Sequence, residues 1–425
     1  MKYKLTKIHN GLRVMTIPMA TLASATVVVW VKTGSRYEPQ KLNGISHFLE
    51  HMVFKGTKSR PTPKEIADEV DSIGGETNAG TTKDWTNFYI KARNEHLEKM
   101  FDVLSDIVIN PLLKKDDIER EKGVIIEELR MYEDTPMIKI GDVFEELIYE
   151  GNSLGWDIGG SEKSVRSINK DDFLRYRSIH YYPENILITV SGGVTINQVE
   201  KLAEKYFGEL KSNKLNEGIF EEFKFKQKKP QVKLHSKKKE QAHFILGFLG
   251  EGRNYPGRFA QTLLATILGE GMSSRLFIEV REKRGLAYTI KSSFDRYQEV
   301  GYLGTYAGVD VEKVDEAIKV TLDQHYDISN GKDPISNKEI NKAKEYLKGH
   351  LALAMEDTKV VCGFFGEQEL FSKEILTPED VFKKIDSVKV EDVYREAKKT
   401  FKPERLNLAI IGPYDDDSRF RKLLK

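Results

Sequence analysis

The stretch GISHFLEHMVFKGT, residues 44–57, decides how the rest of the chain is interpreted. It has helical periodicity, and residues four apart lie on the same face of a helix. His47 and His51 can therefore direct both imidazoles to one point, with Glu50 beside them. The order H-x-x-E-H is a signature of catalytic zinc sites, in which the glutamate acts as a base without binding the ion. The alternative is a helix whose two histidines make ordinary hydrogen bonds.

A catalytic zinc ion usually takes three protein ligands, so the pattern requires a third donor elsewhere. The predicted helix at residues 118–133 contains the adjacent Glu127 and Glu128. Its buried side is expected to carry the apolar residues Ile118, Val124, Ile125, Leu129 and Tyr132. Glu128 lies at the edge of that side, whereas Glu127 falls on the solvent face. Helix phase therefore selects Glu128 as the third ligand, and Glu121, earlier on the same face, as a carboxylate that orients a ligand. The alternative is that these are surface charges on an amphipathic helix.

Size and composition describe a folded protein of two or three domains. The chain has 425 residues, of which 39% are hydrophobic and 31% charged, with a formal net charge of +1. This balance argues against a nucleic-acid partner. The single cysteine, Cys362, permits no internal disulfide, which favours a reducing compartment. Apolar runs such as residues 25–31 are too short to cross a bilayer, and the first residues lack a signal-peptide pattern. We therefore expect a cytoplasmic protein with no membrane partner.

The order of predicted elements repeats along the chain. In the first half, the strand ATVVVWV precedes the HFLEH helix, and the strand NILITVSGGV lies near the end. In the second half, the strand QAHFILGFLG precedes the helix GRFAQTLLATILG, and the strand LNLAIIGPYD lies near the end. We predict an α+β fold of two similar mixed domains, residues 1–215 and 231–425, joined by a polar, Lys-rich linker at 216–230. The second half has no H-x-x-E-H, so we expect no second metal centre.

Together these segments resemble the pitrilysin/insulinase family of zinc metallopeptidases, specifically the short-chain branch that includes the mitochondrial processing peptidase. The resemblance covers nearly the whole chain, in order, through GSRYEP (34–39), NGISHFLEHMVFKGT (43–57), NAGTTKDWTNFY (78–89), EREKGVIIEE (119–128), HYYPEN (180–185), QAHFILGF (241–248) and LGEGMSSRLFIEVREKRGLAY (268–288). It implies that His47, His51 and Glu128 hold one Zn²⁺ per chain, with Glu50 as general base and Glu121 near the third ligand. It also implies two similar domains that form half of a clamshell, closed by a second chain.

The resemblance also implies residues that bind a peptide substrate. Asn78 and Ala79 resemble the family's edge strand, which binds the peptide by backbone hydrogen bonds. The family usually has a bulky aromatic residue next, where this chain has Gly80, and the alternative for the segment is a simple turn. Arg281 and Tyr288 match residues that hold the peptide carbonyl and its developing oxyanion. Taken alone, they would be one charge of a basic cluster and a strand residue of a core.

From these patterns we expect a zinc-dependent endopeptidase that hydrolyses short unfolded peptides inside a closed two-chain chamber. One chain carries both the zinc motif and the Arg281/Tyr288 pair, which favours a homodimer in which the pair acts on the partner's site. The alternative is a non-catalytic or half-active subunit of a hetero-oligomeric peptidase. A purely structural zinc site is least favoured, because such sites are usually closed by four ligands, often cysteines.

Overall fold

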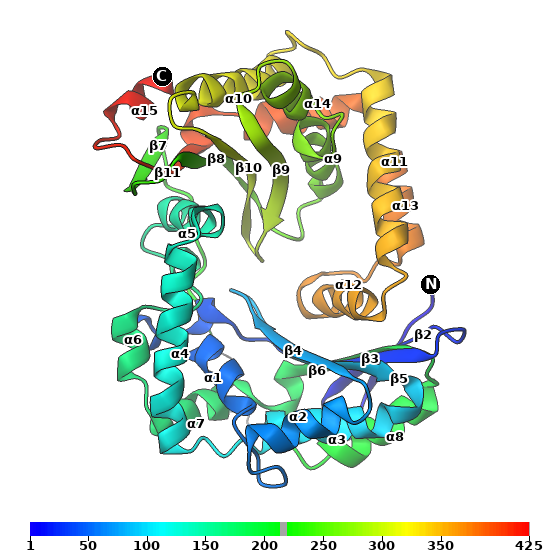
Figure 1. Ribbon diagram of the computed structural model, residues 1–425. Helices are drawn as coiled ribbons and strands as arrows, with labels where there is room; N and C mark the ends of the chain where they lie inside the picture. The colour runs from blue at the N-terminus through cyan, green and yellow to red at the C-terminus, as the bar shows by residue number, and fades with distance from the viewer. Residues whose placement is uncertain (213–218, 425) are drawn as a thin grey trace. The chain divides into compact units, whose positions relative to one another are not determined.

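The computed structural model describes residues 1–212 and 219–424 and divides into two compact units (Figure 1). Unit 1 comprises Met1–Arg130, Trp156–Glu221 and Ala352–Thr377, and unit 2 comprises Met131–Gly155, Glu222–Leu351 and Pro378–Lys425. Each half of the sequence therefore contributes one segment to the unit that is formed mainly by the other half. The predicted domain boundaries, 1–215 and 231–425, do not include this exchange. Residues 213–218, which contain the end of the predicted first domain and the start of the predicted linker, lie outside the described residues.

The sheet of unit 1 has, within the described part of the chain, six strands in the order β1-β2-β6-β3-β5-β4. The pair β2 and β6 is parallel, and every other neighbouring pair is antiparallel. The strands are β1 Lys4–Lys7, β2 Arg13–Pro18, β3 Ser24–Val31, β4 Glu76–Thr81, β5 Thr86–Arg93 and β6 Ile186–Gly192. Consequently β4 forms one edge of this sheet.

The sheet of unit 2 repeats this plan in the order β7-β11-β8-β10-β9. The pair β7 and β11 is parallel, and the other pairs are antiparallel. Its strands are β7 Gln231–Ser236, β8 Gln241–Glu251, β9 Ala287–Arg296, β10 Val300–Asp310 and β11 Leu406–Gly412. The order β2-β6-β3-β5-β4 in the first sheet corresponds, strand by strand and in direction, to β7-β11-β8-β10-β9 in the second. The prediction of two similar mixed domains is therefore confirmed.

Both faces of the first sheet are covered by helices, which explains its apolar strands. The helices α1 (Ile45–Val53), α3 (Leu97–Ile109) and α8 (Ile196–Phe207) pack on one face, and α12 (Thr358–Phe371) packs on the other. Alternate residues of β3 point to the two faces, as the strand period requires. Val27 and Val29 enter the core cluster beneath α1 and α3, whereas Trp30 lies against Gly366 of α12. Every residue of β6 is buried.

The second sheet is covered in the same way. The helices α9 (Arg258–Gly269), α10 (Val314–Ser329) and α14 (Val390–Thr400) lie on one face, and α5 (Pro136–Ile148) lies on the other. Phe144 of α5 packs against Gly247 of β8, and every residue of β11 is buried. Thus α5 belongs to the first half of the sequence but covers the sheet of unit 2, while α12 belongs to the second half and covers the sheet of unit 1.

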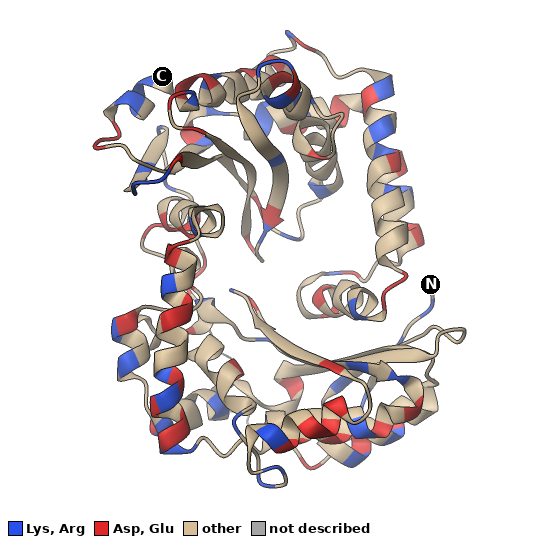
Figure 2. Ribbon diagram, viewed as in Figure 1, with Lys and Arg blue, Asp and Glu red and all other residues tan. Residues whose placement is uncertain are grey.

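The remaining helices include two long, highly charged ones. Figure 2 shows acidic and basic residues interspersed along α4 (Lys115–Glu133) and α11 (Asn337–Ala354), while the strands carry few charges. The others are α2 Pro63–Asp71, α6 Glu162–Ser167, α7 Lys170–His180, α13 Pro378–Ser387 and α15 Ser418–Leu423. In the described part of the chain, no helix combines the length and the hydropathy that a membrane crossing requires.

Candidate metal centre

Helix α1 begins at a glycine and is capped by a buried carboxylate. Gly44 has φ of 97°, and a Cβ there would lie 2.5 Å from the carbonyl oxygen of Gly159, so no larger residue fits. The Glu38 carboxylate accepts hydrogen bonds from the backbone N–H groups of Gly44 at 2.7 Å and Ser46 at 2.8 Å. Burial raises the pKa of Glu38 to about 7, and these hydrogen bonds oppose the rise. The acceptor occupies the positive end of the helix dipole and fixes where α1 starts.

The three predicted ligand atoms lie close together. His47 Nε2 and His51 Nε2 are 3.2 Å apart, and Glu128 Oε2 is 3.6 Å from the first nitrogen and 3.5 Å from the second. Ligand atoms about 2 Å from a tetrahedral zinc ion are separated by about 3.3 Å, so the donor set fits that ion. Among the described residues, His47, His51 and Glu128 are the one group of His, Cys, Asp or Glu side chains whose ligand atoms lie close enough to hold a metal ion.

The choice between the two adjacent glutamates follows from their exposure on α4. The Glu128 side chain is 23% exposed, whereas that of Glu127 is 71% exposed and bonds to Arg130 at 2.6 Å. One of the apolar markers used to set the helix phase is wrong, because Val124 is 49% exposed. Ile126, which was not among the markers, is buried instead. The other markers are buried or half-buried, so the phase still places Glu128 toward α1.

Glu121 lies beside the candidate ligands. Its Oε1 is 2.9 Å from His51 Nδ1, and its Oε2 is 2.7 Å from Lys55 Nζ. With Nδ1 donating to the carboxylate, Nε2 of His51 is left with its lone pair toward the other two donors. Burial acts to raise the pKa of Glu121, but the hydrogen bonds from His51 and Lys55 outweigh it and lower this pKa. The carboxylate therefore fixes both the tautomer and the orientation of His51.

Glu50 lies on the same helix, and its carboxylate contacts the edge strand. The Thr81 hydroxyl at the end of β4 donates to Glu50 Oε2 at 2.6 Å. Burial raises the pKa of Glu50, against the effect of that hydrogen bond. A carboxyl group with a raised pKa accepts and returns protons more readily near neutral pH. The arrangement is what a general base beside a metal ion requires.

The two histidines differ in their electrostatics. Burial, followed by the neighbouring His51, lowers the pKa of His47 to about 4, so this imidazole is neutral near pH 7. Burial also acts to lower the pKa of His51, but Glu121 and the nearby carboxylates outweigh it and raise this pKa. Since a histidine must be neutral to bind a metal, the raised pKa means that protons compete with a cation for His51 as the pH falls.

Asn78 and Ala79 lie on β4, at the edge of the first sheet, so the alternative that they form a turn is wrong. Asn78 pairs with β5 on one side, and its side-chain oxygen accepts a hydrogen bond from Ala79 N at 2.8 Å. A Cβ on Gly80 would meet only ordinary contacts, the nearest being Asn87 at 3.6 Å. The edge strand thus leads, through Thr81, directly to the carboxylate of Glu50.

Arg281 and Tyr288 lie together in unit 2. Arg281 is on a π-helical segment, Phe277–Glu282, and its guanidinium carbon is 5.1 Å from the centre of the Tyr288 ring. Tyr288, near the start of the edge strand β9, is 78% exposed. The alternative that Tyr288 is a core residue is therefore wrong, and the pair presents a cation and a hydroxyl at the surface.

Two residues that shape the site were not identified from the sequence. Glu38 belongs to the GSRYEP stretch, but nothing in that stretch predicts that its carboxylate caps α1. Thr81 follows the expected Asn78-Ala79 segment, and the strand period places it on the same face as Ala79. That alternation is the signal that could have pointed Thr81 toward α1, whereas the contact of Glu38 depends on tertiary structure.

Comparisons with known proteins agree with this geometry. The model of the family "Insulinase (Peptidase family M16)" matches residues 13–159, and that of "Peptidase M16 inactive domain" matches residues 167–347. An uncharacterized zinc protease of Bacillus subtilis is 35% identical over 412 residues, covering 95% of this chain and 97% of the relative. The chain belongs to peptidase family M16, the insulinase family. The resemblance to pitrilysin/insulinase peptidases is therefore confirmed.

Other members of the M16 family support the same assignment. An uncharacterized zinc protease of Streptomyces coelicolor is 34% identical, covering 98% of this M16 chain and 91% of the relative. The crystal structure of a protease from Helicobacter pylori has a TM-score of 0.90 and 26% identity, and covers 97% of this chain and 100% of its own. Relatives named zinc proteases support a zinc peptidase, in line with the two-histidine, one-carboxylate donor set.

Proposed function

We propose that the chain is a zinc-dependent endopeptidase that hydrolyses short unfolded peptides inside a closed chamber formed by two chains. The observation that carries the proposal is the convergence of His47 Nε2, His51 Nε2 and Glu128 Oε2, with Glu50 on the same helix. Three donors leave one coordination position for water or substrate, which distinguishes a catalytic zinc site from a closed structural one.

The proposed chemistry assigns each site residue a distinct role. His47, His51 and Glu128 would hold one Zn²⁺, which when bound supplies the Lewis acidity that acidifies water and polarises a carbonyl. Glu50 accepts the proton of the attacking water and returns it to the leaving amine. Thr81 donates to one oxygen of Glu50 and leaves the other to face the water.

The edge strand β4 provides the proposed docking site for the peptide. An extended substrate adds to the sheet alongside Asn78 and Ala79 through backbone hydrogen bonds. Such binding depends on an extended main chain and reads side chains weakly, because the hydrogen bonds come from groups that every residue shares. Length and flexibility should therefore govern substrate choice, and folded proteins should be excluded.

The proposed second wall of the chamber carries Arg281 and Tyr288. The half-buried Arg281 guanidinium and the exposed Tyr288 hydroxyl are suited to hold the peptide carbonyl and the charge that develops on it. Because one chain contains this pair and the metal donors, we propose a homodimer with two sites, in which the pair serves the partner's site. The single buried cysteine, Cys362, is compatible with the reducing cytoplasm as its location.

The test is cleavage of a mixed peptide library by wild type and Glu50→Gln, with zinc content measured on both. We expect about one zinc per chain in each protein, and a loss of about 10²- to 10⁴-fold in cleavage rate for Glu50→Gln, because the amide cannot take the water's proton. A folded Glu50→Gln protein that retains the wild-type rate would contradict the assignment of Glu50.

The remaining alternative is a non-catalytic or half-active subunit of a hetero-oligomeric peptidase. Gel filtration of the purified chain, with activity measured on each fraction, separates the possibilities. A dimer that cleaves peptides supports the proposal. A folded, zinc-loaded chain that cleaves no peptide in the library would instead identify a subunit that requires a different partner or serves a structural role.

A further inference from the structure

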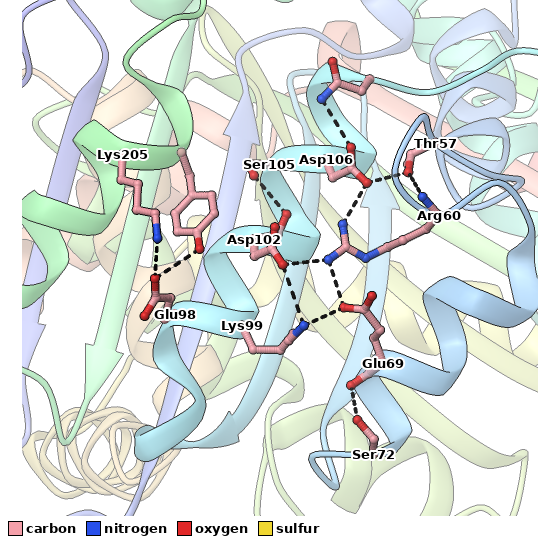
Figure 3. Close-up of polar contacts among 12 residues, drawn as sticks. Thr57, Arg60, Glu69, Ser72, Glu98, Lys99, Asp102, Ser105, Asp106 and Lys205 are labelled. Carbon is pink, nitrogen blue, oxygen red and sulfur yellow. Dashed lines mark hydrogen bonds and ion pairs between the residues drawn. The ribbon is translucent and has the colours of Figure 1, made fainter.

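The loop that follows the metal-site helix is held by a buried arginine. The Arg60 side chain is 5% exposed, and its guanidinium reaches three carboxylates from two helices (Figure 3). Its Nη1 donates to Asp106 at 2.8 Å, while Nη2 donates to Asp102 at 2.7 Å and to Glu69 at 2.8 Å. Lys99 adds a second cation, 2.8 Å from Glu69. The cluster thus joins the loop after α1 to both α2 and α3.

Arg60 also closes the loop on itself. Its backbone N–H donates to the Thr57 hydroxyl oxygen at 2.9 Å, and its carbonyl accepts from Thr57 N at 2.7 Å. The Thr57 hydroxyl in turn donates to the same Asp106 oxygen that Arg60 binds. The other Asp106 oxygen accepts from the Asn110 side chain at 3.2 Å. One carboxylate therefore fixes the loop after α1 and the end of α3 together.

This loop is joined to the segment that enters α4. Gly56 O accepts from Leu112 N at 3.0 Å, and Thr57 forms an isolated bridge with Pro111. Lys114 Nζ donates to the carbonyl of Pro61 at 2.8 Å. Since α4 starts directly after this segment, the loop connects the helix that carries the two histidines with the helix that carries the third donor.

We propose that Arg60 is a positioning residue of the metal centre, which holds α1 and α4 in the register that brings His47, His51 and Glu128 together. The inference rests on the proposed metal site. Without the guanidinium, three buried or half-buried carboxylates are left beside Thr57, and their mutual repulsion moves the loop that joins the two helices. The donor atoms then lose the spacing of 3.2 to 3.6 Å that suits a tetrahedral ion.

Unit 2 offers a matched control, because an arginine clamps the corresponding loop there. Arg275 follows α9 and is 10% exposed in its side chain. It bonds to Glu339 of α11 through Nε at 2.8 Å and to Asp333, just before α11, at 3.0 Å. An arginine holds the loop after the corresponding helix in both repeats. Among the described residues, however, only the loop held by Arg60 lies between two helices that carry metal donors.

The experiment compares Arg60→Met, Arg60→Lys and Arg275→Met in the full chain. Three quantities are measured: the thermal midpoint of the metal-free protein, the affinity for Zn²⁺ by chelator competition, and the visible absorption of the Co²⁺-loaded protein. Affinity is measured well below every thermal midpoint, so that global unfolding does not contribute. We expect both Met variants to lower the thermal midpoint, because Arg60→Met leaves the buried Asp106 without its cation and Arg275→Met does the same to the half-buried Glu339.

Only Arg60→Met is expected to weaken Zn²⁺ binding, by about 10-fold or more, and to change the Co²⁺ spectrum. Arg60→Lys should lose less Zn²⁺ affinity than Arg60→Met, since lysine keeps the positive charge but lacks the forked set of N–H donors of the guanidinium. Wild-type Zn²⁺ affinity and an unaltered Co²⁺ spectrum in folded Arg60→Met would overturn the proposal, as would an equal loss in Arg275→Met. Should Arg60→Met not fold, Asp106→Asn provides the milder test with the same expected order. A wild type that binds no metal would instead refute the proposed function.

Discussion

The two sheets of the chain share one plan down to individual contacts, but the helices that follow their corresponding strands differ. In unit 1, Gly34 lies against the β4–β5 loop, where a Cβ would be 2.1 Å from a carbonyl oxygen; in unit 2, Gly252 lies against the β9–β10 loop, where the distance is 2.5 Å. The N–H of a nearby arginine donates to the same loop, from Arg36 at 3.1 Å and from Arg253 at 2.9 Å. These contacts set the path from strand to helix in both repeats.

The helices that begin after these turns carry different side chains. Helix α1 carries two histidines and a glutamate, whereas α9 reads RFAQTLLATILG and is packed into an apolar core. The described residues of unit 2 contain no group of donors that could hold a metal ion. The repeat therefore folds with or without the donors, and the proposed chemistry depends on a few side chains of α1 and α4 rather than on the architecture.

The comparison predicts that each unit loses stability in acid through a buried histidine that is not a metal donor. Each contains a buried neutral histidine, His180 in unit 1 and His325 in unit 2, and burial lowers the pKa of each to about 4. In the unfolded chain these pKa values are about 6.5, so the unfolded state binds more protons between the two values. Stability should fall as the pH decreases through that window, by about 1.4 kcal/mol per pH unit for each histidine.

Urea unfolding of the metal-free protein at pH 7 and pH 5 measures this effect. Each of His180→Gln and His325→Gln should remove about 2 kcal/mol of the pH-dependent part, whatever its effect on stability at pH 7. If only one of the two substitutions changes the pH dependence of stability, the expected symmetry between the units is contradicted.

The metal donors should respond to a change that leaves the shared fold intact. Glu121→Gln removes the charge that contacts His51 and Lys55, and we expect Zn²⁺ affinity to fall by about 10- to 100-fold. Glu127→Gln, on the exposed side of the same helix, should have no such effect. Chelator competition on both variants gives the answer, and equal affinities would mean that Glu121 serves only to pair Lys55.

The smallest expected effects concern the helices that cover the second face of each sheet. A Cβ on Gly366 of α12 would lie 2.8 Å from the Trp30 ring, and one on Gly247 of β8 would lie 2.5 Å from the Phe144 ring. Overpacking of this kind destabilises a protein by about 1–3 kcal/mol. At position 366, which is helical, the higher helix propensity of alanine offsets about 1 kcal/mol of that loss. Gly247→Ala should therefore be the more destabilising of the two in thermal unfolding.

Gly363 provides the control for this pair. It lies on α12 like Gly366, but a Cβ there would meet nothing within 4 Å. Gly363→Ala should therefore stabilise the protein by up to about 1 kcal/mol through helix propensity. A stabilising Gly366→Ala would show that α12 can shift on its sheet without loss.

Much of the fold and the candidate site could be predicted because their signals are local. The order of Thr62 and Pro63 before an amphipathic run predicts a capped helix, and α2 begins there with a capping box. The spacing of His47 and His51, and the phase of Glu128, depend only on helix geometry. Periodicity in the sequence is sufficient wherever one element decides which way a side chain points.

The rest depends on which elements meet in space. Val124 was placed on the buried side because it is apolar. The polar Glu121 is buried on α4 instead, because His51 of α1 and Lys55, just after α1, supply its partners. The exchange of α5 and α12 between the units has no local signal, since both helices are apolar on one face whichever sheet they cover. Tertiary contacts of this kind cannot be derived from periodicity alone.

The exchange of α5 and α12 has a consequence for how the protein is made. During synthesis the strands of the first sheet leave the ribosome well before α12, which is encoded at Thr358–Phe371. Until then, one face of that sheet, including Trp30, has no helix of its own to cover it. Unit 1 therefore cannot complete its fold and wait for unit 2, because α12 is made only after most of the chain of unit 2 has been synthesised.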